Sequence, residues 1–240
     1  MEKRKLAEVT EQQQYFEAVP TSSPERDEGT RNMGLLYPFI ISGGSNTEHY
    51  YFKHISNVTN HKFNIKPEYF GNEASYPEEF PKRINSILKN NADAKIFCVF
   101  DFDTIYNNKA NQENHKRFVT SIKKEIAKGS VVLCPSMPSI EYWFLLHFIN
   151  YTDLIKSCGT KLQSLLSPFM LPFFQNSKKK LLNLLKSEKC INNSEWVLKL
   201  CEGGKLDDAI QRAESNIALS EAKGELGEHS YSFVYKVFKD

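Results

Sequence analysis

From Leu35 onward, short apolar runs alternate with longer segments in which apolar residues recur at helical spacing. The apolar runs predict four strands, at residues 35–42, 61–67, 94–103 and 130–136, the second being the weakest. The periodic segments predict helices at residues 47–58, 76–91, 111–129 and 139–149. Alternating strands and helices form a mostly parallel sheet with right-handed crossovers, so an α/β fold is expected. The run at 94–103 contains a continuous apolar stretch at 96–100, which is typical of a strand with helices on both faces.

The pattern changes after Pro138. Beyond residue 150 it predicts helices and loops, with helices at residues 176–190, 194–203 and 205–222. The aromatic segment 228–240 is compatible with either a helix or a strand. Three regions are therefore expected: an N-terminal arm at 1–33, an α/β core at 34–150 and a mainly helical C-terminal appendage at 151–240. The arm is polar and rich in turn residues, so it is either a loosely tethered tail or a segment that orders on a partner or a second copy.

Composition narrows the function classes. The 240-residue chain is 40% hydrophobic with a formal net charge of +2, so it has material for a core but no global electrostatic preference for nucleic acid. We therefore expect the isolated protein to bind nucleic acid weakly and salt-sensitively. Its five cysteines lack C-x-x-C spacing, which indicates reduced thiols rather than a zinc site. The first ten residues are charged and no apolar run reaches the ~18 residues needed to cross a bilayer, so a soluble, cytoplasmic protein is expected.

Acidic residues follow the most apolar strand. Asp101 and Asp103 are two positions apart, so in extended backbone both carboxylates would point into one crevice at the carboxyl end of the sheet. Two such charges repel each other unless a cation lies between them, and hard oxygen ligands suit Mg²⁺, or Mn²⁺ in its place. The alternative is that Asp103 caps a turn while Asp101 is solvated at the strand end.

Two other segments carry candidate site residues. Gly43 and Gly44 end the first strand, where backbone N–H groups could hold a phosphate, and Glu48 lies in the first turn of the next helix. A carboxylate there is also favoured by the helix dipole alone. On the helix after the fourth strand, Glu141 and His147 are candidates, although the favoured interpretation is a core helix in which hydrogen bonds satisfy His147.

A basic tract, Lys178–Lys180, precedes a cluster of leucines. The pattern predicts an amphipathic helix with a solvated basic face. The alternative is a face that contacts phosphates or docks a partner.

Three segments in register resemble the RloB-like family, whose core is similar to the Toprim fold of topoisomerases, primases and OLD-type nucleases. "IISGGSNTEHYYF" resembles the family's strand followed by C-E-G-x-x-T-E-x-x-Y-F. "FCVFDFDT" resembles its V-F-D-x-D, and "CPSMPSIEYWFLLHF" resembles its S-N-P-x-F-E-x-W-x-L-L-H-F. The C-terminal "HSYSFVYKVF" is faintly similar to the family's end. The resemblance spans most of Leu35 to Asp240 and omits the N-terminal arm.

The resemblance implies a Mg²⁺-dependent site for phosphodiester chemistry in bacterial defence against phage, including abortive infection. It implies an ATPase partner, nucleic acid (DNA or RNA, tRNA included) as substrate, and allows a homo-oligomer. Asp101 and Asp103 match the family's metal-binding aspartates, and Glu48 matches its second acidic position. Glu141 and His147 match its later motif.

The sequence departs from the family at one position. The family's first glutamate, which acts as a general acid/base or as a metal ligand, corresponds to Gly43 here, so "S-G-G" replaces "C-E-G". Losing a general acid/base typically costs ~10²–10⁴-fold in rate. Two hypotheses follow: a Toprim-like nuclease in which Asp101 and Asp103 hold Mg²⁺ and Glu48 assists, or a catalytically degenerate binding subunit that senses nucleic acid or a phage protein and regulates an ATPase.

The polar composition of residues 1–33 predicts that the arm is dispensable for folding of the rest of the chain. Limited proteolysis should remove it and leave a stable fragment beginning near Leu35, with the melting temperature of the intact protein. A large drop in melting temperature after deletion of residues 1–33 would contradict this expectation.

Overall fold

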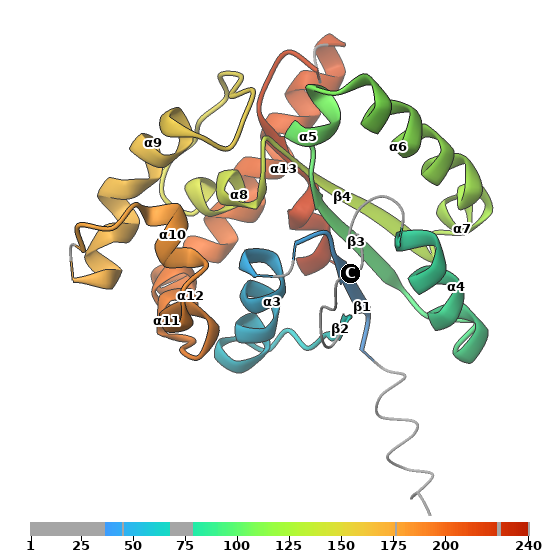
Figure 1. Ribbon diagram of the computed structural model, residues 1–240, viewed down its shortest axis with the longest axis horizontal. Helices are drawn as coiled ribbons and strands as arrows, with labels where there is room; N and C mark the ends of the chain where they lie inside the picture. Colours follow the sequence, from blue (N-terminus) through green and yellow to red (C-terminus); the bar gives the residue numbers. More distant parts are fainter. Residues whose placement is uncertain (1–36, 45, 68–78, 176, 225–226, 240) are drawn as a thin grey trace, which may run out of the picture. The chain divides into compact units, whose positions relative to one another are not determined.

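The computed structural model describes residues 37–44, 46–67, 79–175, 177–224 and 227–239. The predicted arm at 1–33 lies outside these residues, as does the start of the helix predicted at 76–91. The described part of the chain forms an α/β fold around a five-stranded sheet in the order β2-β1-β3-β4-β5 (Figure 1). The predicted α/β class with a mostly parallel sheet is confirmed.

The first three strands are shorter than predicted, whereas the fourth has the predicted seven residues, shifted by one position. The first four are parallel: β1 (Phe39–Ser42), β2 (Asn64–Lys66), β3 (Ile96–Asp101) and β4 (Val131–Met137). The fifth, β5 (Tyr231–Ser232), pairs antiparallel with β4. Within the aromatic C-terminal segment, this strand is followed by the 3-10 helix η3 (Phe233–Phe238), so the segment is a strand and a helix in succession.

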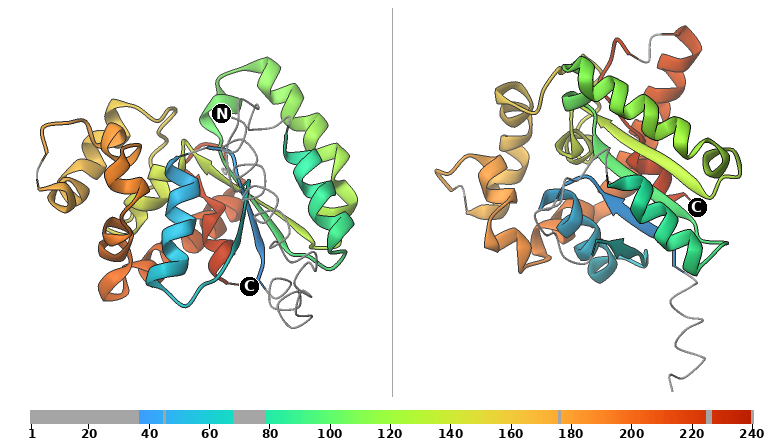
Figure 2. Two further views of the ribbon diagram at one scale, coloured as in Figure 1. Left: turned by 60° about the horizontal axis from the view of Figure 1, so that its bottom comes forward. Right: turned by 45° about the vertical axis from the view of Figure 1, so that its right-hand side comes forward.

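Alternation along β3 produces two hydrophobic cores. Phe97 and Val99 point to one face, whereas Cys98 and Phe100 point to the other, and all four are buried. The second face is covered by α4 (Phe80–Asn90), α6 (Lys109–Ser121) and α7 (Lys123–Ala127). The first face is covered by α3 (Thr47–Val58), α8 (Ile140–Leu146) and the C-terminal helices (Figures 1 and 2).

The C-terminal half contributes to the same core as the first face of the sheet. It contains α9 (Thr160–Met170), η1 (Leu171–Phe174), α10 (Leu181–Leu185), α11 (Glu188–Ile191), α12 (Glu195–Cys201), η2 (Glu202–Gly204) and α13 (Lys205–Lys223). Buried side chains of these helices form one cluster with those of β1, β3, α3 and α8. The boundary expected near residue 150 marks a change to mainly helical structure, while the hydrophobic core continues across it.

Two predicted helices are interrupted. The helix predicted at 111–129 breaks at Ile122, where the hydroxyls of Thr120 and Ser121 bond to the carbonyls of Lys116 and Phe118 and weaken the helix. The helix predicted at 176–190 divides into α10 and α11. Lys178 and Lys179 precede α10 and Lys180 is its N-cap, so the predicted basic face of an amphipathic helix is wrong: these lysines lie outside the helix. None of the described helices combines the length and apolarity needed to cross a membrane.

A buried hydrogen bond joins α8 to α3 inside the first core. The indole Nε1 of Trp143 donates to the hydroxyl of Tyr51 over 2.8 Å, and both side chains are fully buried. Phe144 packs against the Tyr51 ring with centroids 5.1 Å apart. This bond fixes α8 against α3, the two helices that carry Glu141 and Glu48.

We predict that Tyr51→Phe destabilises the fold by about 1–3 kcal/mol, because it leaves the buried Trp143 N–H without an acceptor. Chemical denaturation of the full chain would measure the loss. The matched control is Tyr106→Phe, whose ring is 37% exposed, with an expected change within about 0.5 kcal/mol. Equal effects of the two substitutions would contradict the structural role of this bond.

Candidate acidic site

Loops from β1, β3 and β4 meet at the carboxyl edge of the sheet. Since these strands are parallel, the residues after each strand lie at the same edge. The backbone N–H groups of Phe102 and Asp103 donate to the carbonyl of Pro138 over 3.1 and 3.0 Å, which ties the loop after β3 to the loop after β4. This edge positions the acidic residues that the sequence singled out.

Asp101 is the last residue of β3 and remains partly exposed. Its Oδ1 accepts a hydrogen bond of 2.8 Å from the backbone N–H of Ile140, the first residue of α8. Burial raises the pKa of Asp101 well above its usual range, and the charges of Glu48, Glu141 and, least, Asp103 raise it further. The Ile140 hydrogen bond opposes this rise without cancelling it.

Glu48 lies in the first turn of α3 and is 5% exposed. Burial raises its pKa to about 7, and the charge of Glu141 adds to the rise. Hydrogen bonds from its own N–H and from that of Gly44 lower the pKa, as does the positive charge of Lys186. A carboxyl group with this pKa can exchange a proton near neutral pH, which is what general acid/base catalysis requires.

Glu141 is buried at the start of α8. Its Oε2 accepts from the hydroxyl of Ser139 over 2.6 Å and from the thiol of Cys158 over 3.4 Å. Burial and the charge of Glu141 raise the pKa of the Cys158 thiol, so Cys158 stays protonated and acts as a donor. Three carboxyl groups from three different elements, Glu48, Asp101 and Glu141, thus influence one another at this edge. We refer to these three as the acidic site.

Asp103 lies apart from the position predicted for it. The expectation of extended backbone through residue 103 is wrong, because Phe102 has φ −95° and ψ −14° and Asp103 begins the short helix α5 (Asp103–Tyr106). Its Oδ2 accepts 3.0 Å from the backbone N–H of Cys158. Asp101 is consequently more strongly coupled to Glu48 and Glu141 than to Asp103.

Different neighbours limit the side chain that can stand at Gly43 and at Gly44. A Cβ on Gly44 would lie 2.1 Å from Oε2 of Glu48, so only glycine allows that carboxylate to fold against the loop. A Cβ on Gly43 would lie 3.1 Å from Cβ of Phe100, and its φ is outside the left-handed region. Phe100 points into the second core, on the face of β3 opposite Asp101. A side chain at position 43 would therefore start on the far face of the sheet from α3 and α8.

His147 follows α8, at the other end of this helix from Glu141. Its Nδ1 donates to the carbonyl of Trp143 over 3.0 Å, and its ring contacts the Trp143 ring edge-on at 4.9 Å. Burial lowers the pKa of His147 to about 3, and the charges of Arg212 and Lys205 lower it further. The imidazole is neutral, fully buried and separated from the acidic site, so its environment is that of a core residue.

Three contributors to the site escaped sequence reasoning. Ser139 was detectable, since a serine immediately before an apolar helix is a common N-cap. Cys158 and Lys186 gave no signal, because each comes from the C-terminal half and reaches the site only through the fold. The segment just before Cys158 is anchored by two hydrogen bonds. Asn107 donates to the carbonyl of Lys156, and Ser230 accepts from the N–H of Ile155.

The donor set suits a hard divalent cation, although no cage is preformed. The carboxylates are oxygen ligands that repel one another, which a cation would relieve. In the described ranges, no three or more His, Cys, Asp or Glu side chains are arranged so that they could hold a metal ion. Asp101 and Glu141 are instead engaged in the protein hydrogen bonds described above, which a cation would have to replace or share.

Comparison with known proteins gave one match. The family model described as "RloB: RloB-like protein" matches residues 38–240. No curated protein and no solved structure matches the chain.

The raised pKa of Glu48 predicts an unusual pH dependence of stability. The unfolded chain ionises this carboxyl near pH 4.5 and the folded protein near pH 7, so its contribution to folding is lost as pH rises between these values. The loss would reach about 3 kcal/mol for an uncoupled group. Burial lowers the pKa values of five histidines, so their contribution to stability increases as pH rises. They are His49, His54, His61, His115 and His147. The difference in stability between wild type and a Glu48 variant is therefore the informative quantity.

Denaturation of wild type and Glu48→Gln in EDTA should show the variant gaining stability relative to wild type from pH 4.5 to about 7. The gain should then level off, because both states of the wild type are ionised at higher pH. Glu221→Gln, an exposed substitution on α13, serves as the control and should show no trend. A pH-independent difference for Glu48→Gln would show that this carboxyl does not titrate as described.

Proposed function

The chain belongs to the RloB-like family, and we propose that its acidic site cleaves phosphodiester bonds of nucleic acid with a divalent cation. The observation that carries this proposal is the convergence of Glu48, Asp101 and Glu141, each from a different element, at the carboxyl edge of a parallel sheet. Bringing three mutually repelling carboxyl groups together, two of them buried, opposes folding, and such arrangements occur mainly where they serve chemistry. The similarity of the family's core to the Toprim fold, inferred from the sequence motifs, supports the same reaction class.

Asp101, Glu48 and Glu141 would have to rearrange to hold Mg²⁺ or Mn²⁺ together, and Asp103 could join if it released the N–H of Cys158. The cation would polarise the phosphodiester and stabilise the charge that develops on it. The protein's own contributions are distinct. Glu48, with a pKa of about 7, is suited to hold or accept a proton, and Asp101 is oriented by the Ile140 N–H. Lys186 places a positive charge beside Glu48, where an anionic substrate would approach.

The biological setting follows from the family. We propose that the protein acts in anti-phage defence beside an ATPase partner, with DNA or RNA as its substrate. The near-neutral net charge leaves affinity to local contacts, to a partner or to several copies of the chain.

A second candidate is a catalytically degenerate subunit that binds nucleic acid or a phage protein and regulates the ATPase. The replacement of the family's first glutamate by Gly43 favours it. Cleavage assays on the purified protein separate the two candidates, with plasmid, single-stranded DNA and tRNA in Mg²⁺ or Mn²⁺. The nuclease cleaves at least one of these, and the degenerate subunit cleaves none.

If the acidic site is catalytic, Asp101→Asn and Glu48→Gln should each lower cleavage by ~10²–10⁴-fold, and Asp103→Asn should do the same only if Asp103 joins the cation. Asp101→Asn should also raise stability in EDTA, because it removes a repelling charge. Added Mg²⁺ or Mn²⁺ should stabilise wild type, by about 2.7 kcal/mol at a hundred times Kd, and should not stabilise Asp101→Asn. Asp93→Asn, which changes an exposed aspartate, is the matched control for both measurements.

A folded Asp101→Asn, Asp103→Asn double variant with full activity and the wild-type response to metal would exclude the aspartates from the mechanism. Gly43→Glu tests the missing glutamate, with Gly43→Ala as the control for crowding against Phe100. Activity that is higher than wild type in Gly43→Glu but not in Gly43→Ala would show that the absent carboxylate limits the reaction.

A further inference from the structure

A cavity of about 330 Å³ lies in the C-terminal half, away from the acidic site. Its wall combines aromatic rings with side-chain amides, from η1, α11 and the turn before α12. The wall includes Phe173, Gln175, Asn192, Asn193 and Trp196. The volume is at the lower end of the roughly 300–1,000 Å³ typical of small-molecule sites. We refer to it as the aromatic cavity.

The aromatic part of the wall is firmly anchored. Trp196 is 3% exposed, its Nε1 donates to the carbonyl of Cys190 over 3.2 Å, and its ring packs against Phe144 and Tyr51. Phe173 is only partly buried and packs against Phe148. A rigid indole edge and an accessible phenyl ring therefore border one cavity, an arrangement that suits a flat, aromatic ligand.

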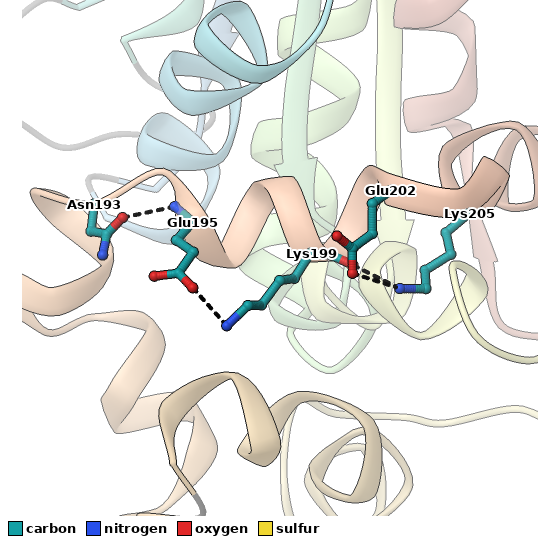
Figure 3. A network of polar contacts seen from close by, with 5 residues as sticks. All are labelled: Asn193, Glu195, Lys199, Glu202 and Lys205. Atoms are coloured by element: carbon teal, nitrogen blue, oxygen red, sulfur yellow. Dashed lines mark hydrogen bonds and ion pairs between the residues drawn. The ribbon is translucent and has the colours of Figure 1, made fainter.

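The polar part of the wall leaves donors and acceptors for a ligand. Asn193 uses its Oδ1 to accept from the N–H of Glu195, so its amide NH₂ is not needed for this cap (Figure 3). Asn192 is exposed at the cavity. Gln175 lines the same cavity from the other side. Amides that present both donors and acceptors match the edges of nucleobases.

Most of the acidic side chains near the aromatic cavity are paired with lysines, whereas the neighbouring segment is rich in lysine. Glu195 is paired with Lys199 at 2.7 Å, and Glu202 with Lys205 at 3.6 Å, so the acidic residues of this network are neutralised (Figure 3). A second cavity of about 340 Å³ shares Glu188 and Lys189 with the first. Its segment, residues 177–191, contains five lysines and one glutamate.

The same segment runs along α3 toward the acidic site. His54 of α3 hydrogen-bonds the carbonyl of Cys190 through Nε2 over 2.7 Å, and α12 packs against α3. Lys186, in the same segment, acts electrostatically on Glu48. Lys189, which lines both cavities, and Lys186 therefore place positive charge at the aromatic cavity and close to the acidic site.

We infer that the two cavities bind a single strand of nucleic acid. An unpaired base enters the aromatic cavity against Phe173, with its edge on the amides of Asn192 and Gln175. Phosphates of the same strand contact Lys179 and Lys189, and Lys186 guides the strand to Glu48. A duplex is excluded, because its bases are paired and stacked inside the helix. The course of the nucleic-acid strand to Glu48 rests on the proposed function, whereas the binding of a base in the aromatic cavity does not.

Binding is measured on the full chain in EDTA, so that neither metal nor cleavage contributes. The probes are a labelled short single strand, the same strand without bases, its duplex and a free mononucleotide. The single strand should bind at least about tenfold more tightly than the abasic strand, since base stacking on an aromatic side chain is worth that much or more. It should also change the fluorescence of Trp196, while Trp143, the other tryptophan, is fully buried.

Phe173→Ala should bind the normal strand nearly as weakly as the abasic one. Asn192→Ala should lose part of this difference, with an unchanged melting temperature. Lys179→Glu with Lys189→Glu should weaken both strands and flatten the salt dependence. The matched control is Lys123→Glu with Lys128→Glu, which makes the same charge change at exposed positions of α7 and its C-cap. The control should bind like wild type.

Equal affinity for the normal and abasic strands, for the duplex, or for the free mononucleotide would overturn the inference. So would wild-type binding by Asn192→Ala and the lysine variant, or an equal loss in the charge control. Failure of the proposed function looks different. In that case the strand still binds through its bases and no substrate is cleaved, whereas loss of the cavity alone leaves cleavage by the acidic site with base-independent binding.

Discussion

The structure depends on burying β3 on both faces. This strand supplies apolar side chains alternately to two cores, so neither face can be left to water. The helices between β2 and β4 cover one face. The other face is covered by α3, α8 and most of the chain beyond residue 150, whose buried side chains form one cluster with those of β1 and β3. The C-terminal half is therefore part of the core that holds the sheet.

This arrangement determines how the acidic site is built. Loops after three parallel strands bring Glu48, Asp101 and Glu141 to one edge, and the C-terminal half completes their surroundings. Cys158 donates its thiol to Glu141 and its backbone N–H to Asp103. The segment that carries Cys158 is fixed in turn by an antiparallel bridge between Asp153 and His229, next to β5. Residues near the end of the chain thus help to orient the carboxylates of Glu141 and Asp103, which lie far earlier in the sequence.

The electrostatics of the site and of the lysine segment are complementary. Burial raises the pKa values of Glu48 and Asp101, the neighbouring carboxylates raise them further, and Lys186 is the positive charge that lowers the pKa of Glu48. Trp196 connects the two regions mechanically, since its ring contacts Tyr51 on α3, one turn after Glu48. A ligand in the aromatic cavity would therefore contact a side chain packed on the helix that carries the proposed proton carrier.

The sequence by itself determined the α/β class, the strand order along the chain, the family and most acidic residues, because these follow from local periodicity and short motifs. It did not determine where helices break, since hydroxyl side chains at Thr120 and Ser121 compete locally with the helix. Only the tertiary structure grouped Asp101 with Glu141 and Glu48 more closely than with Asp103, because the chain turns at Phe102. It alone brought Cys158 and Lys186 to the site, since contacts between distant segments leave no periodic trace in a single sequence.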